Sequence, residues 1–293
     1  IRNPSHFGEG QTFIGTIFDT CDASGKGDIV ATFSVVVRTD QFITAMATGP
    51  DGSTSEFSRA LCLLDSDGDG IFDCWESFGD GIDVNADGVI DLDLYKKGAR
   101  PNHKDIFVEV DYMFGFQPGD SVLPLVQSAF ARVKNKYVNN PDHNNGINLF
   151  TELTPDDLPI PDSTWTSNWW SKFFETKKQF FGTDRERTDS NSANILEAKR
   201  LVYRYCIFAD RHDIDESSGI AELNEVTGGN DFMVTLGGGA WDINDSLNAG
   251  TFMHELGHTL GLRHGGGDNI NYKPNYYSVM NYTWQAPQFV AQY

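Results

Sequence analysis

The spacing of apolar residues changes along the chain and predicts parts of different structure. Residues 11–60 contain short runs rich in β-branched and aromatic side chains, separated by turn clusters such as DASGKGD and GPDGSTS. Such runs predict β-strands. Three or four strands make half of a sandwich, so we expect a small β-sandwich-like module over residues 1–60 and a native chain that extends upstream. Residues 61–100 are acidic and predict loops, and strand and helix patterns alternate over residues 101–293.

The alternating part predicts a mixed sheet with helices, which is an α+β fold. Expected strands cover residues 106–113, 146–150, 201–209 and 231–236, and expected helices cover 121–137, 165–181 and 251–264. The run at 201–209 is apolar almost throughout, as in a strand buried on both faces. The helix at 121–137 has Leu125, Phe130 and Val133 among its expected buried positions. The aromatic side chains of 165–181 are expected in the core, with carbohydrate binding as the alternative.

The stretch TFMHELGHTLGLRH carries side chains that suit a metal ion. His254 and His258 are four residues apart, so a helix places both imidazoles on one face. Glu255 lies one residue on, close to the metal without being a natural ligand, which is where a general base belongs. Gly261 lets the chain leave the helix through positive φ, and that turn would bring His264 back as a third ligand. Three nitrogen ligands with one open position form a catalytic zinc arrangement.

These residues carry a family resemblance. HELGHTLGLRH matches the HExxHxxGxxH consensus of the metzincin metallopeptidases, and SVMNY resembles their Met-turn. The resemblance is specific in residues 251–282 and architectural upstream, and it implies a twisted mixed sheet with the active-site helix beneath it. It also implies the roles of five residues: zinc ligands His254, His258 and His264, the general base Glu255, and the floor beneath the zinc, Met280.

Three further expectations follow from the resemblance. Tyr282 stands where astacins and serralysins carry a tyrosine that ligates zinc at rest, and it is either such a ligand or a packed aromatic residue. Gly265 matches no metzincin subfamily at this position, so the subfamily stays open. The strand at 231–236 would be the sheet edge to which an extended peptide substrate adds, with residues 271–280 as the wall of the specificity pocket.

Two acidic loops in residues 61–100 predict calcium binding, because alternating oxygen ligands around a glycine suit a hard cation. They look similar to thrombospondin-type-3 or dockerin loops, and the alternative is a solvated acidic linker. The first loop offers Asp65, Asp67, Asp69, the carbonyl of Ile71, Asp73 and Glu76. The second loop offers Asp83, Asn85, Asp87, the carbonyl of Val89, Asp91 and Asp93.

Charge and hydropathy narrow the classes of partner. The 293 residues include 42 acidic and 22 basic side chains, for a net charge of −20. This charge argues against nucleic acid or an anionic membrane surface as a partner. The sequence has no apolar run long enough to span a membrane, and its start lacks signal-peptide features. Calcium loops beside a metzincin domain favour a secreted, bacterial protein from which any signal peptide has been removed.

Cysteine and histidine positions add smaller expectations. Cys62 and Cys74 bracket an acidic loop and are the favoured disulfide, Cys206 is expected to be a buried thiol, and Cys21 has no evident partner, so other pairings stay open. A zinc-blocking role for Cys21 with the following aspartate is the less favoured interpretation. His212 lies among acidic residues, and we expect a solvated loop there in preference to a second metal site.

The sequence therefore predicts a secreted zinc endopeptidase that hydrolyses peptide bonds with a zinc-activated water and Glu255 as the base. The alternative from another class is a calcium-dependent adhesion or scaffold protein with an inactive or latent protease domain. The intact set of ligands, base and Met280 argues against this alternative. A zinc hydrolase for substrates other than peptides is a third hypothesis. The sequence leaves the oligomeric state open.

Overall fold

A computed structural model gives the structure of residues 10, 12–21, 32–35, 37, 42–58, 61–85, 87–153, 159–161, 165, 168–212, 217–223, 229–237 and 244–285. Within these residues the largest element is a five-stranded sheet with the strand order β4-β3-β5-β7-β6. Its strands are β3 (Asp105–Tyr112), β4 (Asn148–Glu152), β5 (Tyr203–Phe208), β6 (Gly219–Ala221) and β7 (Asp231–Val234). β4, β3, β5 and β7 are parallel to their neighbours, and β6 pairs antiparallel with β7. The mixed, mostly parallel sheet confirms the predicted α+β class.

The edge of the sheet differs from the prediction. The strand expected at 231–236 corresponds to β7, which pairs with β5 on one side and with β6 on the other. It is therefore an inner strand, and the prediction that it forms the edge was wrong. The edge strand beside β7 is β6, and its three residues are too few to give a period-two pattern in the sequence.

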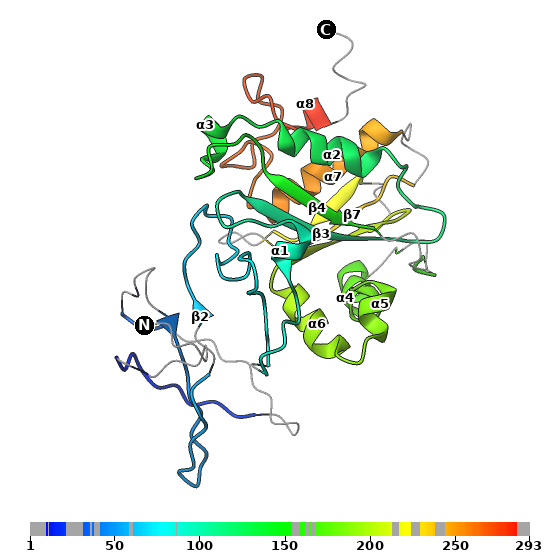
Figure 1. The fold of residues 1–293 in the computed structure, drawn as a ribbon. Coiled ribbons are helices and arrows are strands. Elements are labelled where there is room, and N and C mark those ends of the chain that lie inside the picture. Colours follow the sequence, from blue (N-terminus) through cyan, green and yellow to red (C-terminus); the bar gives the residue numbers. More distant parts are fainter. Residues whose placement is uncertain are drawn as a thin grey trace.

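Helices cover both faces of the sheet (Figure 1). They are α1 (Leu94–Lys97), α2 (Val122–Ala131), α3 (Asn135–Val138), α4 (Trp169–Phe180), α5 (Asp184–Thr188), α6 (Ser192–Arg200), α7 (Asp245–Thr259) and α8 (Tyr282–Gln285). Figure 1 shows α2 and α7 on one face and α4, α5 and α6 on the opposite face. The helix that carries the histidine motif, α7, thus lies against the sheet as predicted.

Alternate residues of the strands fill two cores. In β3, Val108 and Val110 join a core shared with α2 and α7, while Phe107 joins a core shared with α4 and α6. In β5, Cys206 faces the first core and Tyr205 the second. Both faces of β5 are therefore buried, which confirms the prediction from its apolar run and the prediction of a buried Cys206 thiol.

The aromatic stripe at 165–181 belongs to the second core. Trp165, Phe173 and Phe181 are buried, whereas Phe174 is exposed. The rings of Phe173 and Phe181 both contact the ring of Tyr205 edge-on. These contacts confirm the expected role of the stripe in packing.

The helix expected at 121–137 is two helices. The chain becomes extended at Lys134, with ψ of 138°, and the carbonyl of Val133 accepts a hydrogen bond from the Gly146 N–H. This bond ties the turn to the segment that enters β4, so α2 ends before it. Leu125 is exposed, contrary to the prediction, because the buried face of α2 runs through Val122, Leu123 and Val126; Phe130 and Val133 are half-buried.

The segment before the sheet shows little regular structure in the part described. β1 (Phe42–Ile43) pairs antiparallel with β2 (Leu61–Cys62), and the described portions of 11–18 and 27–37 contain no strand. The β-sandwich-like module stays a prediction. The disulfide between Cys62 and Cys74 is present as predicted, and Cys21 is an exposed free cysteine whose neighbouring aspartate lies outside the described residues. None of the described helices combines the length and the apolar character needed to cross a bilayer.

Candidate metal centre

α7 brings the histidine motif to the sheet and then reverses the chain. The helix begins after Asn244, whose side-chain oxygen accepts a hydrogen bond of 3.0 Å from the Leu247 N–H. Leu256 packs in the core against the sheet. The helix ends at Thr259, and Gly261 follows with φ of +84°, the left-handed conformation predicted for it. This turn returns the chain so that His264 approaches the helix.

The three histidines converge on one point. His254, His258 and His264 each offer a ring nitrogen within 4.8 Å of the others. The Nδ1 atoms of His254 and His258 lie 2.8 Å from the carbonyl oxygens of Val279 and Leu262. Because a carbonyl only accepts hydrogen bonds, each Nδ1 carries the proton and each Nε2 presents a lone pair. The two Nε2 atoms are 3.0 Å apart, and two lone pairs facing at that distance fit a cation between them.

Burial keeps the three imidazoles neutral. It lowers the pKa of His254 to about 3 and also lowers the pKa values of His258 and His264. A neutral imidazole is the form that binds a metal ion. The donor set therefore fits the zinc ion that the sequence predicts.

Glu255 lies on the next position of α7 and faces the edge strand. It is 4% exposed, and burial raises its pKa to about 8. A Cβ atom on Gly219, the first residue of β6, would stand 2.7 Å from Oε1 of Glu255. The carboxyl group is thus held between the histidine helix and the edge of the sheet, which is where a base for a bound substrate would be useful.

Met280 and Tyr282 both lie at the histidines. Met280 is buried, and its sulfur lies directly against Gly257, the residue before His258. The ring centroid of Tyr282 is 4.5 Å from that of His264 and 5.5 Å from that of His254. The structure therefore places every residue of the predicted zinc site together.

Residues that the sequence did not single out hold the segment after His264. The buried Asn281 donates from Nδ2 to the carbonyls of Lys273 and Tyr276, and its Oδ1 accepts from the Tyr272 N–H. The Asn271 side chain accepts from the Tyr282 N–H at 3.0 Å. The partners are backbone groups, which any residue provides, so they leave no signal in the sequence. The position of Asn281 between Met280 and Tyr282 is the available clue to its role.

A clamp explains the glycine after His264. Lys273 Nζ lies 2.7 Å from both carboxylate oxygens of Asp268 and 3.1 Å from the carbonyl of Gly265. A Cβ on Gly265 would stand 2.7 Å from the carbonyl of Ile270 and 2.8 Å from Lys273 Nζ. A side chain at 265 would therefore displace the clamp that closes the loop of the third histidine.

The first acidic loop wraps around its own carboxylates. Asp65 accepts backbone hydrogen bonds from Gly68 at 2.7 Å and Gly70 at 3.0 Å, and Gly70 has φ of +94°. Oxygens of Asp65, Asp67 and Asp69 lie within 4.8 Å of one another. Among the other predicted ligands, Glu76 is buried near Asp69, whereas Asp73 accepts from the backbone and hydroxyl of Ser66 and closes the loop from outside.

The second acidic loop is folded similarly but its carboxylates are spread. Asp83 accepts from the Gly88 N–H at 2.9 Å and Asp87 accepts from the Val89 N–H at 2.8 Å. Asp91 accepts from the Val84 N–H and from the Asn191 side chain. Asp93 caps α1 and pairs with Lys96 at 2.9 Å, and Asn85 donates to Asp87. Within the described residues of this loop, no three carboxylates converge.

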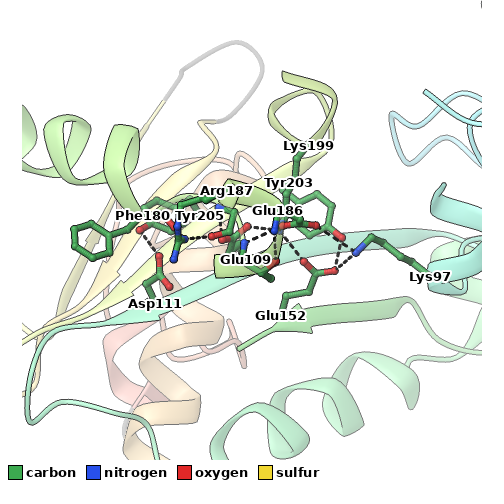
Figure 2. A network of polar contacts seen from close by, with 12 residues as sticks. Lys97, Glu109, Asp111, Glu152, Phe180, Glu186, Arg187, Lys199, Tyr203 and Tyr205 are labelled. Carbon is green, nitrogen blue, oxygen red and sulfur yellow. Dashed lines mark hydrogen bonds and ion pairs between the residues drawn. The ribbon is translucent and has the colours of Figure 1, made fainter. Parts of the chain in front are cut away.

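Another carboxylate cluster lies on the far face of the sheet and is neutralised by a lysine (Figure 2). Lys199 Nζ is 2.5 Å from Glu109, 2.8 Å from Glu152 and 2.7 Å from Glu186. Lys97 also pairs with Glu152, at 2.6 Å. The buried ammonium occupies the centre of the cluster, so these glutamates form an ion network and no metal site. The network could not be predicted from the sequence, because Glu109 has the pattern of an ordinary polar position in an alternating strand.

His212 is buried, so the expected solvated loop at this residue was wrong. Its Nδ1 lies 3.1 Å from the hydroxyl of Thr235, and its ring packs edge-on against Trp169. The side chain packs below the sheet beside the aromatic helix α4. Among the described residues it belongs to no group of metal-binding side chains.

One comparison with known proteins agrees with the candidate metal centre over part of the chain. Residues 170–265 match the model of the reprolysin-like metallopeptidase family M12B. The match runs from α4 to the residue after His264 and supports a zinc metallopeptidase. No curated protein matches the chain. A crystal structure of archaemetzincin from Methanopyrus kandleri is similar over 63% of this chain and 83% of its own, with 13% identity and a TM-score of 0.29, which is too low to establish a shared fold.

Proposed function

We propose that this protein is a secreted, zinc-dependent endopeptidase of the metzincin type. The observation that carries the proposal is the geometry of the two helix histidines. Both Nδ1 atoms of His254 and His258 face backbone carbonyls, and both Nε2 atoms face each other 3.0 Å apart. His264 supplies a third nitrogen and the family match covers all three residues.

Zinc held by the three imidazoles would act as a Lewis acid and lower the pKa of a water molecule to about 7. The positive charge of a bound zinc would favour the ionised form of Glu255 against the effect of burial. Its carboxylate would then accept the proton of the attacking water and pass it to the leaving amine nitrogen. The phenol of Tyr282, beside His264 and His254, donates a hydrogen bond to the substrate oxygen as negative charge develops there. Met280 and Asn281 fix the floor and the turn beneath these groups.

The substrate would bind as an extended peptide along β6. Of the two edge strands in the described part of the sheet, β4 and β6, it is β6 whose first residue, Gly219, touches Glu255. Backbone hydrogen bonds to an edge strand bind a peptide with little dependence on its side chains. The same geometry would bring a peptide bond close to the base.

We also propose that the first acidic loop binds calcium. The inward backbone hydrogen bonds of Asp65 and the meeting of Asp65, Asp67 and Asp69 support this for the first loop. The Cys62–Cys74 disulfide beside the loop supports export to an oxidising compartment.

The test is cleavage of an unstructured protein, casein, by the full chain and by its Glu255→Ala variant, with zinc content measured on both. We expect cleavage by the wild type alone and one tightly bound zinc in each protein, because Glu255 is no ligand. Zinc without cleavage in either protein would favour the scaffold alternative with a latent domain. Cleavage by the variant at the wild-type rate would show that Glu255 is not the base.

A further inference from the structure

The first acidic loop meets the catalytic sheet at Asp105, the first residue of β3. The Asp105 N–H donates a hydrogen bond of 2.7 Å to Oδ2 of Asp69. Carboxylate oxygens of Asp69, Glu76 and Asp105 lie within 4.8 Å of one another. Asp69 also belongs to the group with Asp65 and Asp67, so the carboxylates of the loop and the one from the sheet form a continuous cluster.

Glu76 points into this cluster without a hydrogen-bond donor. It is 0% exposed, and no N–H or hydroxyl group donates to either of its oxygens. The carboxyl group within hydrogen-bond reach of it is that of Asp105, another acid. Oδ2 of Asp67 is buried and unpartnered in the same way. A buried carboxylate without a donor or counterion is strongly unfavourable. The ionised forms of Glu76 and Asp67 become favourable when a cation lies between their oxygens.

The raised pKa values of the clustered carboxyl groups also indicate that no nearby cation balances their charge. Burial, followed by the charge of Asp69, raises the pKa of Glu76 to about 10 and that of Asp67 to about 7. Lys104 lowers the pKa of Asp67, but this pKa still stands at about 7, so the lysine does not neutralise the group. Burial also raises the pKa of Asp105.

Asp105 is held in place by the sheet. Its Oδ1 accepts a hydrogen bond of 2.7 Å from the Asn148 side chain in β4, and its Oδ2 accepts one of 2.8 Å from the Arg100 N–H. Outer contacts of this kind orient a metal ligand. A carboxylate oxygen has lone pairs left for a cation after accepting one hydrogen bond.

We propose that a calcium ion is held jointly by Asp69 and Glu76 of the first acidic loop and by Asp105 of β3. This proposal rests on calcium binding by the loop and adds a ligand from the catalytic sheet. Carboxylates alone, from a glycine-bent loop, suit calcium better than zinc or copper, which prefer nitrogen or sulfur ligands. The ion docks the acidic segment onto the end of β3, the strand that pairs with both β4 and β5.

The test compares calcium titration and hydrogen exchange in the full chain, in Asp105→Asn and in a control, Asp120→Asn, which changes an exposed aspartate. Calcium is expected to slow exchange in residues 65–76 and in the first residues of β3. Asp105→Asn should weaken calcium binding on the order of tenfold. It should also abolish the slowing of hydrogen exchange that calcium causes in the first residues of β3. The control should behave as the wild type does.

A second variant keeps the test decisive if Asp105→Asn folds poorly. Glu76→Gln removes a proposed calcium ligand with little change of shape. Because its pKa is about 10, Glu76 is uncharged near pH 7 without calcium, so the variant should unfold at nearly the same temperature as the calcium-free wild type. The variant should lack the rise in unfolding temperature that calcium causes in the wild type, and an equal rise in both proteins would contradict the proposal.

The outcomes separate the two proposals. Unchanged affinity and unchanged protection of β3 in Asp105→Asn would overturn the bridging ligand while leaving calcium binding by the loop intact. No calcium uptake by the folded wild type would overturn both. Casein cleavage by the same samples reports on the zinc site independently.

Discussion

Two glycines allow the closest contacts of the candidate active site. Gly219 lies against the Glu255 carboxyl group, and Gly257 lies against the Met280 sulfur. Neither has φ in the left-handed region, so the missing side chain matters here for space and not for backbone conformation. The positions of Glu255 and Met280 therefore depend on the absence of a side chain at Gly219 and Gly257.

The first prediction concerns Gly219. In Gly219→Ala the new Cβ would stand 2.7 Å from Cγ and Oε1 of Glu255 and 2.7 Å from the Met233 carbonyl, so either the base or the edge strand must move. We expect the rate of casein cleavage to fall about 100-fold, since displacements near 1 Å have such effects. Zinc content should be unchanged.

Gly267→Ala is the matched control, because a Cβ at Gly267 would meet nothing within 4 Å. It should leave the cleavage rate within about twofold of the wild type. Equal rates for Gly219→Ala and the control would mean that the position of Glu255 does not depend on β6.

Among single residues, the candidate metal ligands could be predicted from the sequence, whereas the groups that orient them could not. His254, Glu255 and His258 follow from helical spacing, and Gly261 followed by His264 from the need for a turn. The carbonyls of Val279 and Leu262 orient the imidazoles, but every residue has a carbonyl. Asp105 was missed because it reads as the ordinary polar start of a strand, far in sequence from the loop it meets.

At the scale of elements, the ion network of Lys199 joins α5 and α6 to the sheet. Lys199 lies on α6, Glu186 on α5, Glu109 on β3 and Glu152 on β4. Burial alone would raise the pKa of Glu152, but Lys199 and Lys97 outweigh burial and bring this pKa down to about 2. Burial raises the pKa of Glu109 to about 8 despite Lys199, so at this carboxyl burial outweighs the lysine.

We therefore predict that Lys199→Met lowers the free energy of unfolding by about 3–5 kcal/mol at pH 7, because it removes the ammonium that pairs with three glutamates and leaves Lys97 to offset their charge. Lys178→Met, which changes an exposed lysine of α4, should cost less than about 0.5 kcal/mol. Urea unfolding of the zinc-loaded proteins measures both values.

The pH dependence of this prediction follows from Glu152. A pKa depressed from 4.5 to about 2 stabilises the fold fully above pH 4.5, and the stabilisation is lost as the pH falls toward 2. The difference between wild type and Lys199→Met should thus be smaller at pH 4 than at pH 7. A difference that grows on acidification would contradict the assignment of the network.

Element predictions succeeded where the pattern was long and failed where tertiary contacts decided. The run that became β3 was recognised by its alternation, the run that became β5 by its continuous apolar character, and the aromatic run that became α4 by its helical spacing. The strand β6 and the helices α5 and α6 were not, since they are short or polar on the surface. The break between α2 and α3 depends on a hydrogen bond from Gly146, which no local pattern shows.

At the scale of the whole molecule, the metal centre and the acidic segment lie on different parts of the same sheet. The histidines are on α7, which packs on one face, and the first acidic loop contacts the start of β3. If calcium and zinc bind as proposed, calcium stabilises the sheet that carries the zinc helix and takes no part in the reaction. The two ions should therefore be separable by experiment.

Zinc removal is the sharpest test of the proposed zinc-dependent cleavage. The full chain, kept in excess calcium, is treated with 1,10-phenanthroline, dialysed, and assayed for zinc and for casein cleavage before and after one equivalent of zinc is returned. We expect one zinc and all cleavage to be lost together, and both to return with the added zinc while the fold is retained throughout. Cleavage by the zinc-free protein, or a folded protein that takes up no zinc, would contradict the proposal.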